Sequence, residues 1–329
     1  MTRLESLCVA LCAALLSGCV ASQPTIRVGT YNIRLTNRNI EKTDGPNAWP
    51  QRREAVVGLI RKMKLDAFGL QEVTPEQAAY LREHLPEFAF VGDHRGADRI
   101  SDEASPVFYR KSRLQAERAG TFWLSETPDV PGTKGWKAAC PRVCSYMILR
   151  DRETGRRFCF ANTHADHRSA EAREKGMLLI VKRMKEFGCG CPIVFVGDHN
   201  CRETEGAARA VARRLQNALY LSETPPVGSW RTWNGWRWRD YEIRVTEALT
   251  IPIERRNENR PHPDLTGATR GKDELLDDTF YERCGGPRLD YIYVSQGVRV
   301  FDYVTVNDSR EGARLYPSDH FPVVATLGL

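Results

Sequence analysis

The sequence contains no internal repeat and no low-complexity linker along its 329 residues. The lack of a repeat excludes solenoids and other arrays, which show self-similarity at a fixed period. The lack of a linker favours a single large domain, and the 41% hydrophobic content is enough to form its core. Positive charge is in only slight excess, with a formal net charge of +6. This balance permits binding to phosphate-rich ligands without requiring it.

The N-terminal apolar stretch, residues 7–16, is too short to span a bilayer. Arg3 precedes it and small residues follow it, a pattern typical of a secretory signal. Leu16-Ser17-Gly18-Cys19 resembles the bacterial lipobox, which implies cleavage before Cys19 and lipid attachment to its sulfur. We therefore expect a signal peptide at residues 1–18 and a tether at residues 19–24. The protein is then exported to the bacterial cell envelope and anchored to a membrane by lipid; an ordinary signal with an incidental cysteine is the alternative.

Zinc-binding cysteine spacings are also absent. Cys140-x-x-x-Cys144 and Cys189-x-Cys191 match no C-x-x-C pattern and have no pair of histidines nearby. Seven cysteines follow Cys19, an odd number, so at least one is unpaired or joined to another molecule. For an exported protein we favour disulfides over zinc ligands, and Cys201 is one candidate for a disulfide that braces the site.

Hydrophobic patterning predicts short strands interrupted by a few helices. The expected helices are 50–64, one that begins with a capping box at Thr74, 169–187 and 203–216. The expected strands are 25–32, 67–70, 107–109, 121–124, 145–149, 157–163, the run that begins at Pro192, 289–294, 299–306 and 321–327. This order indicates one layered α/β or α+β domain over residues 25–329.

Polar side chains follow several of these strands. Asp198 and Asn200 come directly after the apolar run 192–197, where an acid and an amide can hold a hydrolytic water and a phosphate oxygen. Any one such residue is compatible with a simple strand cap. Six strand-end motifs in one chain are not explained that way; the others carry Asn32, Glu72, His164, Asp290 and the pair Asp319-His320.

These motifs resemble the endonuclease/exonuclease/phosphatase superfamily, whose members share the deoxyribonuclease I-like fold. The resemblance covers residues 25–328, and the run 120–128 is similar to a bacterial branch of exported or lipid-anchored proteins. It implies a four-layered α/β sandwich of two packed mixed β-sheets flanked by helices. It also implies a divalent cation, Mg²⁺ or Mn²⁺.

The resemblance assigns roles to the strand-end residues. Glu72 matches the principal metal ligand, with Asn32 alongside it and Asp319 near the metal through water. The remaining assignments are to catalysis: His164 and His320 flank the scissile phosphate, Asp290 orients His320, Asp198 activates water or protonates the leaving group, and Asn200 orients the phosphate.

Further substrate contacts are expected at Tyr109, Arg142 and His167, with a salt bridge or a surface histidine as the alternative for the last two. An insertion at about 229–287 interleaves tryptophans with arginines, and stacked bases or sugar rings suit such a surface. Trp233 and Trp236 are therefore candidate substrate contacts, and a structural hairpin packed on the flank of the domain is the alternative.

His199 departs from the family pattern, which has an apolar residue between the Asp and the Asn of this motif. Alternate side chains of a strand point to opposite faces, so we expect His199 to face the layer behind the site.

The resemblance as a whole implies metal-dependent phosphoester hydrolysis, with a nuclease-like phosphodiesterase ahead of a phosphomonoesterase that acts on phosphoinositides or sugar phosphates. A catalytically silent ligand-binding lipoprotein is the alternative from another class. The expected partners are a phosphoester (nucleic acid, phospholipid head group or small phosphodiester) and a membrane, with no obligate protein partner evident.

Overall fold

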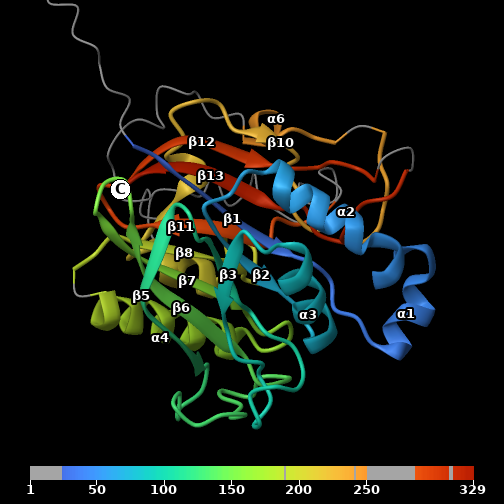
Figure 1. The fold of residues 1–329 in the computed structure, drawn as a ribbon, viewed down its shortest axis with the longest axis horizontal. Coiled ribbons are helices and arrows are strands. Elements are labelled where there is room, and N and C mark those ends of the chain that lie inside the picture. Colours follow the sequence, from blue (N-terminus) through green and yellow to red (C-terminus); the bar gives the residue numbers. More distant parts are fainter. Residues whose placement is uncertain (1–23, 189, 241, 250–285, 311–313) are drawn as a thin grey trace, which may run out of the picture.

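The computed structural model describes residues 24–188, 190–240, 242–249, 286–310 and 314–329, in which two β-sheets pack face to face (Figure 1). The first sheet has the strand order β10-β12-β13-β1-β2-β4-β3 and the second β5-β6-β7-β8-β11-β9. Both are mixed: β1 is parallel to β2 and antiparallel to β13, and β8 is parallel to β7 and antiparallel to β11.

The strands of the first sheet are β1 (Ile26–Asn32), β2 (Ala67–Gln71), β3 (Phe88–Val91), β4 (Val107–Arg110), β10 (Val227–Gly228), β12 (Arg299–Thr305) and β13 (Val323–Gly328). Those of the second sheet are β5 (Leu114–Trp123), β6 (Val143–Asp151), β7 (Arg157–His164), β8 (Ile193–Asp198), β9 (Gln216–Asn217) and β11 (Asp290–Val294).

The helices cover the outer faces of the two sheets. The α-helices are α1 (Arg38–Asp44), α2 (Trp49–Lys62), α3 (Pro75–His84), α4 (Ala170–Gly188), α5 (Gly206–Ala212) and α6 (Val245–Leu249), and two short 3₁₀ turns are η1 (Gly45–Asn47) and η2 (Ala218–Tyr220). One apolar cluster joins α2 and α3 to the first sheet, a second joins α4 and α5 to the other sheet, and a third fills the space between the sheets. The predicted four-layered sandwich is therefore confirmed.

Most of the predicted elements are present, with shifted ends. The capping box at Thr74 and Gln77 is confirmed and begins α3. Several elements were not predicted, namely α1, β3, α6, the two-residue strands β9 and β10 and the two 3₁₀ turns, while β5 is longer and α5 is shorter than the patterns indicated. Within the described residues, no helix combines the length and hydrophobicity needed to cross a bilayer.

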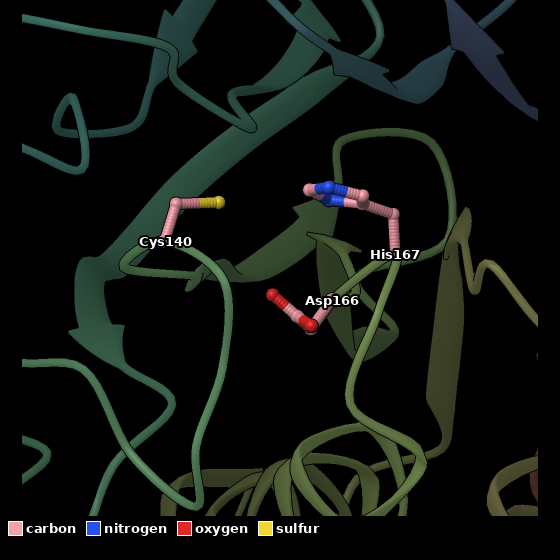
Figure 2. Close-up of side chains that lie close together, drawn as sticks. All are labelled: Cys140, Asp166 and His167. Atoms are coloured by element: carbon pink, nitrogen blue, oxygen red, sulfur yellow. The ribbon is translucent and has the colours of Figure 1, made fainter.

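The five described cysteines are free thiols, so the disulfide predicted for Cys201 is wrong. Cys201 is buried beside α5, and its backbone carbonyl accepts a hydrogen bond from the Tyr291 hydroxyl. Cys140 lies beside Asp166 and His167 (Figure 2). Cys19, Cys189 and Cys284, and with them the predicted lipid site, lie outside the described residues.

Candidate active site

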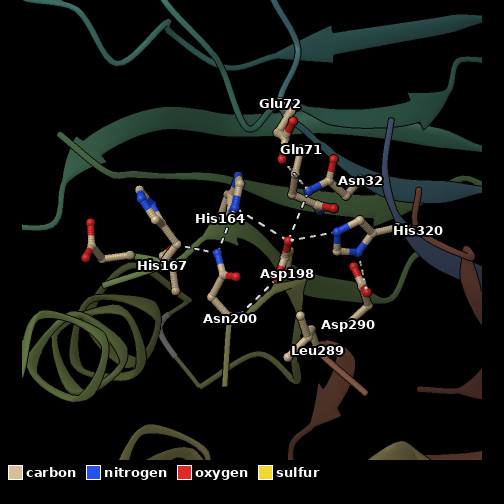
Figure 3. Close-up of polar contacts among 12 residues, drawn as sticks. Asn32, Gln71, Glu72, His164, His167, Asp198, Asn200, Leu289, Asp290 and His320 are labelled. Atoms are coloured by element: carbon tan, nitrogen blue, oxygen red, sulfur yellow. Dashed lines mark hydrogen bonds and ion pairs between the residues drawn. The ribbon is translucent and has the colours of Figure 1, made fainter. Parts of the chain in front are cut away.

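The strand ends predicted to carry chemistry meet at one edge of the sandwich (Figure 3). Pairing within each sheet aligns them: Asn32 is opposite Gln71 in the first sheet, and Asp198 is opposite both His164 and Asp290 in the second. Because the two sheets pack face to face, side chains from both of them, among them Glu72, His164 and Asp198, line one cavity of about 460 Å³.

Asp198 is the hub of the polar contacts at this edge. Its Oδ2 accepts a hydrogen bond from the Asn32 amide at 3.0 Å, and its Oδ1 accepts one from the Asn200 backbone N–H at 3.0 Å. The ring nitrogens of His164 and His320 lie 3.4 and 3.7 Å from Oδ2. The carboxylate is thus fixed between two histidines at the floor of the cavity.

His320 and Asp290 form a buried ion pair, with Nδ1 2.9 Å from Oδ2. Burial lowers the pKa of His320, but the carboxylates of Asp290 and Asp198 outweigh that effect and raise it to about 10. Burial raises the pKa of Asp198 to about 7, with His320 opposing the rise and Asp290 adding to it. Donor atoms of all three groups lie within 4.8 Å of one another. Because both ring nitrogens of His320 already face carboxylates, we interpret this cluster as an ion-pair network, not as a metal centre.

The contacts of Asn200 fix the tautomer of His164. The Asn200 amide nitrogen donates to the Ala165 carbonyl at 3.0 Å, which sets the orientation of the amide. The same nitrogen lies 2.9 Å from His164 Nε2, so Nε2 accepts and the ring proton is on Nδ1. Burial, with Arg142 and Arg95 nearby, holds the pKa of His164 well below its usual value. His164 is therefore a neutral donor at neutral pH.

Glu72 faces the cavity from the end of β2. Its Oε2 accepts from the Leu35 N–H at 2.8 Å and its Oε1 from the Asn32 amide at 2.9 Å. Burial raises the pKa of Glu72, but these hydrogen bonds and the Arg34 guanidinium outweigh it, and the net shift is downward. Glu72 is therefore an ionised carboxylate at the cavity wall.

Asn32 does not lie among the cavity-lining residues, where a metal ligand was expected. Its Oδ1 accepts from the Arg34 backbone N–H at 2.9 Å, so the amide nitrogen faces Glu72 and Asp198. The residue is fully buried and lies behind the two carboxylates, not on the cavity lining. In this structure Asn32 orients both carboxylates as their hydrogen-bond donor, and the prediction that it is a metal ligand is not supported.

The carboxylates that suit a divalent cation are Glu72 and Asp319. Both line the cavity, and the pKa of Asp319 is raised by burial and by the nearby negative charge of Glu72. Two carboxylates that line one cavity and whose negative charges oppose each other are a suitable donor set for Mg²⁺ or Mn²⁺. These residues therefore fit the cation that the sequence implied.

Three residues at the site adopt left-handed backbone conformations, which cost energy for any residue with a Cβ. They are Arg34 (φ 57°), Glu72 (φ 63°) and Asn200 (φ 48°). Glu72 comes directly after the last residue of β2, and Asn200 comes two residues after the end of β8. The turn at each strand end thus aims a functional side chain at the cavity instead of continuing the strand.

Arg142 and His167, the expected further substrate contacts, line the cavity and lie together, with Arg142 Nη2 3.0 Å from His167 Nδ1. Sequence reasoning missed three charged residues of the lining, Arg34, Arg95 and Glu103. Arg95 and Glu103 belong to an irregular loop between β3 and β4, where no strand end or motif marked them.

The cluster of Cys140, Asp166 and His167 at the cavity rim has donor atoms of metal-binding type within 4.8 Å of one another (Figure 2). The Asp166 carboxylate, however, accepts hydrogen bonds from the backbone N–H groups of Ala139, Arg168 and Ser169. Its oxygens are therefore committed to holding two loops together, and we assign no metal to this cluster.

Two predicted substrate contacts lie away from the cavity. Tyr109 pairs with Ala67 at the far end of β2 from Glu72 and packs on the core between the sheets, because the antiparallel register of β4 carries it there. Trp236 does not line the cavity, and its ring lies 5.7 Å from the Arg52 guanidinium. Trp233 does line the cavity.

The remaining tryptophans of the insertion fit the packing alternative. Trp230 is fully buried in the core between the sheets, and Trp238 stacks on Tyr316. The part of the insertion at 250–285 lies outside the described residues.

His199 faces the layer behind the site, as predicted. It is fully buried and stacks on Phe195 and Tyr293 at 4.8 and 5.6 Å. Burial lowers its pKa to about 3. It is a neutral packing residue.

Comparison with known proteins agrees with this geometry. A mannosyl-6-phosphatase of Bacteroides thetaiotaomicron is 28% identical, with a TM-score of 0.74 over 92% of this chain and 99% of that one. An endonuclease/exonuclease/phosphatase of Bacteroides vulgatus is also 28% identical, with a TM-score of 0.74 over 93% of this chain and 100% of that one. An uncharacterized protein of Acanthamoeba polyphaga mimivirus is 24% identical over 160 residues, which are 46% of this chain and 59% of that protein.

The sequence itself matches the endonuclease/exonuclease/phosphatase family over residues 29–320, a range that includes every strand-end residue of the site. The chain belongs to the endonuclease/exonuclease/phosphatase family.

Proposed function

We propose that this protein hydrolyses a phosphoester bond with the help of a divalent cation. The observation that supports it best is the meeting of Asp198, the His320–Asp290 pair, neutral His164 and ionised Glu72 around one cavity. A cation at Glu72 and Asp319, when bound, neutralises charge on the phosphoryl oxygens. The other residues of the site handle the water and the leaving group.

Each of these side chains has a defined part in the reaction. Asp198, once ionised, accepts the proton of the attacking water, because it is a fixed carboxylate on the cavity floor. His320 is positively charged and stabilises the negative charge that develops on the phosphoryl group. The neutral ring of His164 lies beside Asp198 through its Nε2, and Asn200 holds that ring in place.

The ester that we favour is a phosphomonoester of a small alcohol. The similar protein from Bacteroides thetaiotaomicron is a mannosyl-6-phosphatase, and a cavity of about 460 Å³ is of the size that holds a small molecule. On these two grounds we favour a monoesterase over the nuclease-like phosphodiesterase that the sequence favoured.

The test is hydrolysis of p-nitrophenyl phosphate and bis-p-nitrophenyl phosphate by the full chain with Mg²⁺, with Mn²⁺ and with EDTA. Metal-dependent turnover of the monoester is expected, and Asp198→Asn should lower kcat by about 10²- to 10⁴-fold. Asp129→Asn is the control, because Asp129 is an exposed partner of Arg183 outside the cavity. Turnover of neither ester would favour a silent binding protein, and preferred turnover of the diester would favour a phosphodiesterase.

We also propose that the protein is an exported lipoprotein, on the sequence of residues 3–19 alone. Expression in a bacterial host should place the wild type in the membrane fraction, and Cys19→Ser should release it to the soluble fraction. Continued membrane association of Cys19→Ser would contradict the lipid anchor.

A further inference from the structure

The cavity has a second half that the proposed hydrolysis does not use. It is formed by Arg95, Glu103, Cys140, Arg142 and His167, which come from the loops after β3 and β7 and the loop before β6. It adjoins the phosphoester site at His164, whose Nδ1 lies 3.9 Å from Glu103 Oε2. A group attached to the reacting phosphate therefore extends into this half.

Arg95 and Glu103 form a two-point ion pair in the wall, with nitrogen–oxygen distances of 2.8 and 3.2 Å. Both side chains are only 12% exposed. Both residues line the cavity, so the pair presents a carboxylate and a guanidinium group side by side.

Two arginines of the cavity are paired with carboxylates. Arg95 is 2.9 Å from Asp102 in addition to Glu103, and Arg34 is 3.3 Å from Asp44. Within the described part of the lining there is no lysine. The Arg95–Glu103 pair therefore carries no excess positive charge that would favour a second phosphate.

We propose that the Arg95–Glu103 pair binds neighbouring hydroxyl groups of a neutral polyhydroxylated ring, such as a sugar, whose phosphate lies at Asp198. A hydroxyl group both donates and accepts, so adjacent hydroxyls match a carboxylate beside a guanidinium. The proposal rests on the proposed hydrolysis and adds the class of alcohol that the enzyme selects.

The test compares hexose 6-phosphates with n-hexyl phosphate, which has a similar primary alkyl leaving group and no ring hydroxyl. The measured quantity is the ratio of kcat/KM for the two esters, in the wild type and in Glu103→Gln. We expect the wild type to prefer a hexose 6-phosphate and Glu103→Gln to lower the ratio by about 10- to 100-fold, as for loss of hydrogen bonds to a charged group. Glu117→Gln is the control, because Glu117 forms a similar ion pair with Arg157, at 2.6 Å, away from the cavity.

Equal or better use of n-hexyl phosphate by the wild type, or an unchanged ratio in Glu103→Gln, would overturn the proposal. If neither ester is turned over, the proposed hydrolysis fails instead. Binding by calorimetry with Mg²⁺ then decides the subsite separately. Tighter binding of hexose 6-phosphate than of n-hexyl phosphate, lost in Glu103→Gln, supports it, and equal binding refutes it.

Discussion

At the scale of single residues, the site is a set of buried charges whose protonation depends on their neighbours. His320 lies between Asp290 and Asp198, at 2.9 and 3.7 Å, and each carboxylate favours the protonated form of the histidine. Burial raises the pKa of Asp198, and the positive charge of His320 opposes that rise. The reaction needs Asp198 ionised and His320 protonated, so the two pKa values set the limits of activity.

We predict a bell-shaped pH profile of kcat/KM. Activity should rise as Asp198 loses its proton, at or below about pH 7, because a bound cation also favours the carboxylate, and should fall as His320 deprotonates near pH 10. His320→Gln removes a positive charge that lowers the pKa of Asp198. The acid limb of this variant's pH profile should therefore move to higher pH. An acid limb that stays in place would show that a group other than Asp198 controls the limb.

Asp290→Asn tests the positioning of His320. The amide keeps the shape of the side chain but loses the charge that raises the pKa of His320. We expect kcat/KM to fall by about 10- to 100-fold and the alkaline limb to move to lower pH. Measurement of the full pH profile separates this loss of charge from a packing effect, which would lower the rate at every pH without moving the alkaline limb.

At the scale of elements, the two sheets are joined by a polar contact just below the site. The Asn162 amide, on β7, donates to the carbonyls of Leu70 and Pro106 at 2.8 and 2.9 Å and accepts from Gln71 at 2.6 Å. It fits there because Gly69, on β2, has no side chain: a Cβ at that position would lie 2.3 Å from the Asn162 side chain.

Gly69→Ala should therefore lower the free energy of unfolding by about 1–3 kcal/mol, since the new methyl group displaces a side chain of the second sheet that is hydrogen-bonded to the first. Chemical denaturation measures the effect. Gly58→Ala is the matched control, because Gly58 is exposed in α2 with nothing near its Cβ position, and it should stabilise by about 0.4–1 kcal/mol. Equal stability of Gly69→Ala and the wild type would show that the inter-sheet contact adapts freely.

The elements also show what the sequence was able to predict. Alternation marked β1, and short apolar runs marked β2 and β8, so the residues at their ends were found. The prediction for Tyr109 was wrong because the pairing of β4 with β2 decides which end of β4 is near the site. The sequence of β4 alone does not contain that information. Arg95 and Glu103 were missed because an irregular loop brings them to the cavity through tertiary contacts alone. The amide orientation of Asn32 likewise depends on a backbone N–H that only the folded turn presents.

At the scale of the whole molecule, the site belongs to neither sheet alone. Glu72 and Asp319 adjoin strands of the first sheet, while His164, Asp198 and Asp290 belong to the second. The Asn32 amide on β1 joins the two halves, because it donates to both Glu72 and Asp198. The full donor set of the cavity therefore exists only when the sandwich is assembled.

We therefore predict that Mg²⁺ or Mn²⁺ stabilises the folded protein, because the unfolded chain lacks this donor set. A cation that binds only the native state adds about 2.7 kcal/mol at a concentration of 100 times Kd. The melting temperature should rise with cation concentration in the wild type and in Asp129→Asn, whose exposed carboxylate is outside the cavity. In Glu72→Gln the rise should be lost, because a neutral amide replaces the ionised carboxylate at the cavity wall. A cation-dependent rise of equal size in Glu72→Gln would place the cation elsewhere, and the Asp198–Asp290–His320 cluster would then be the next donor set to test.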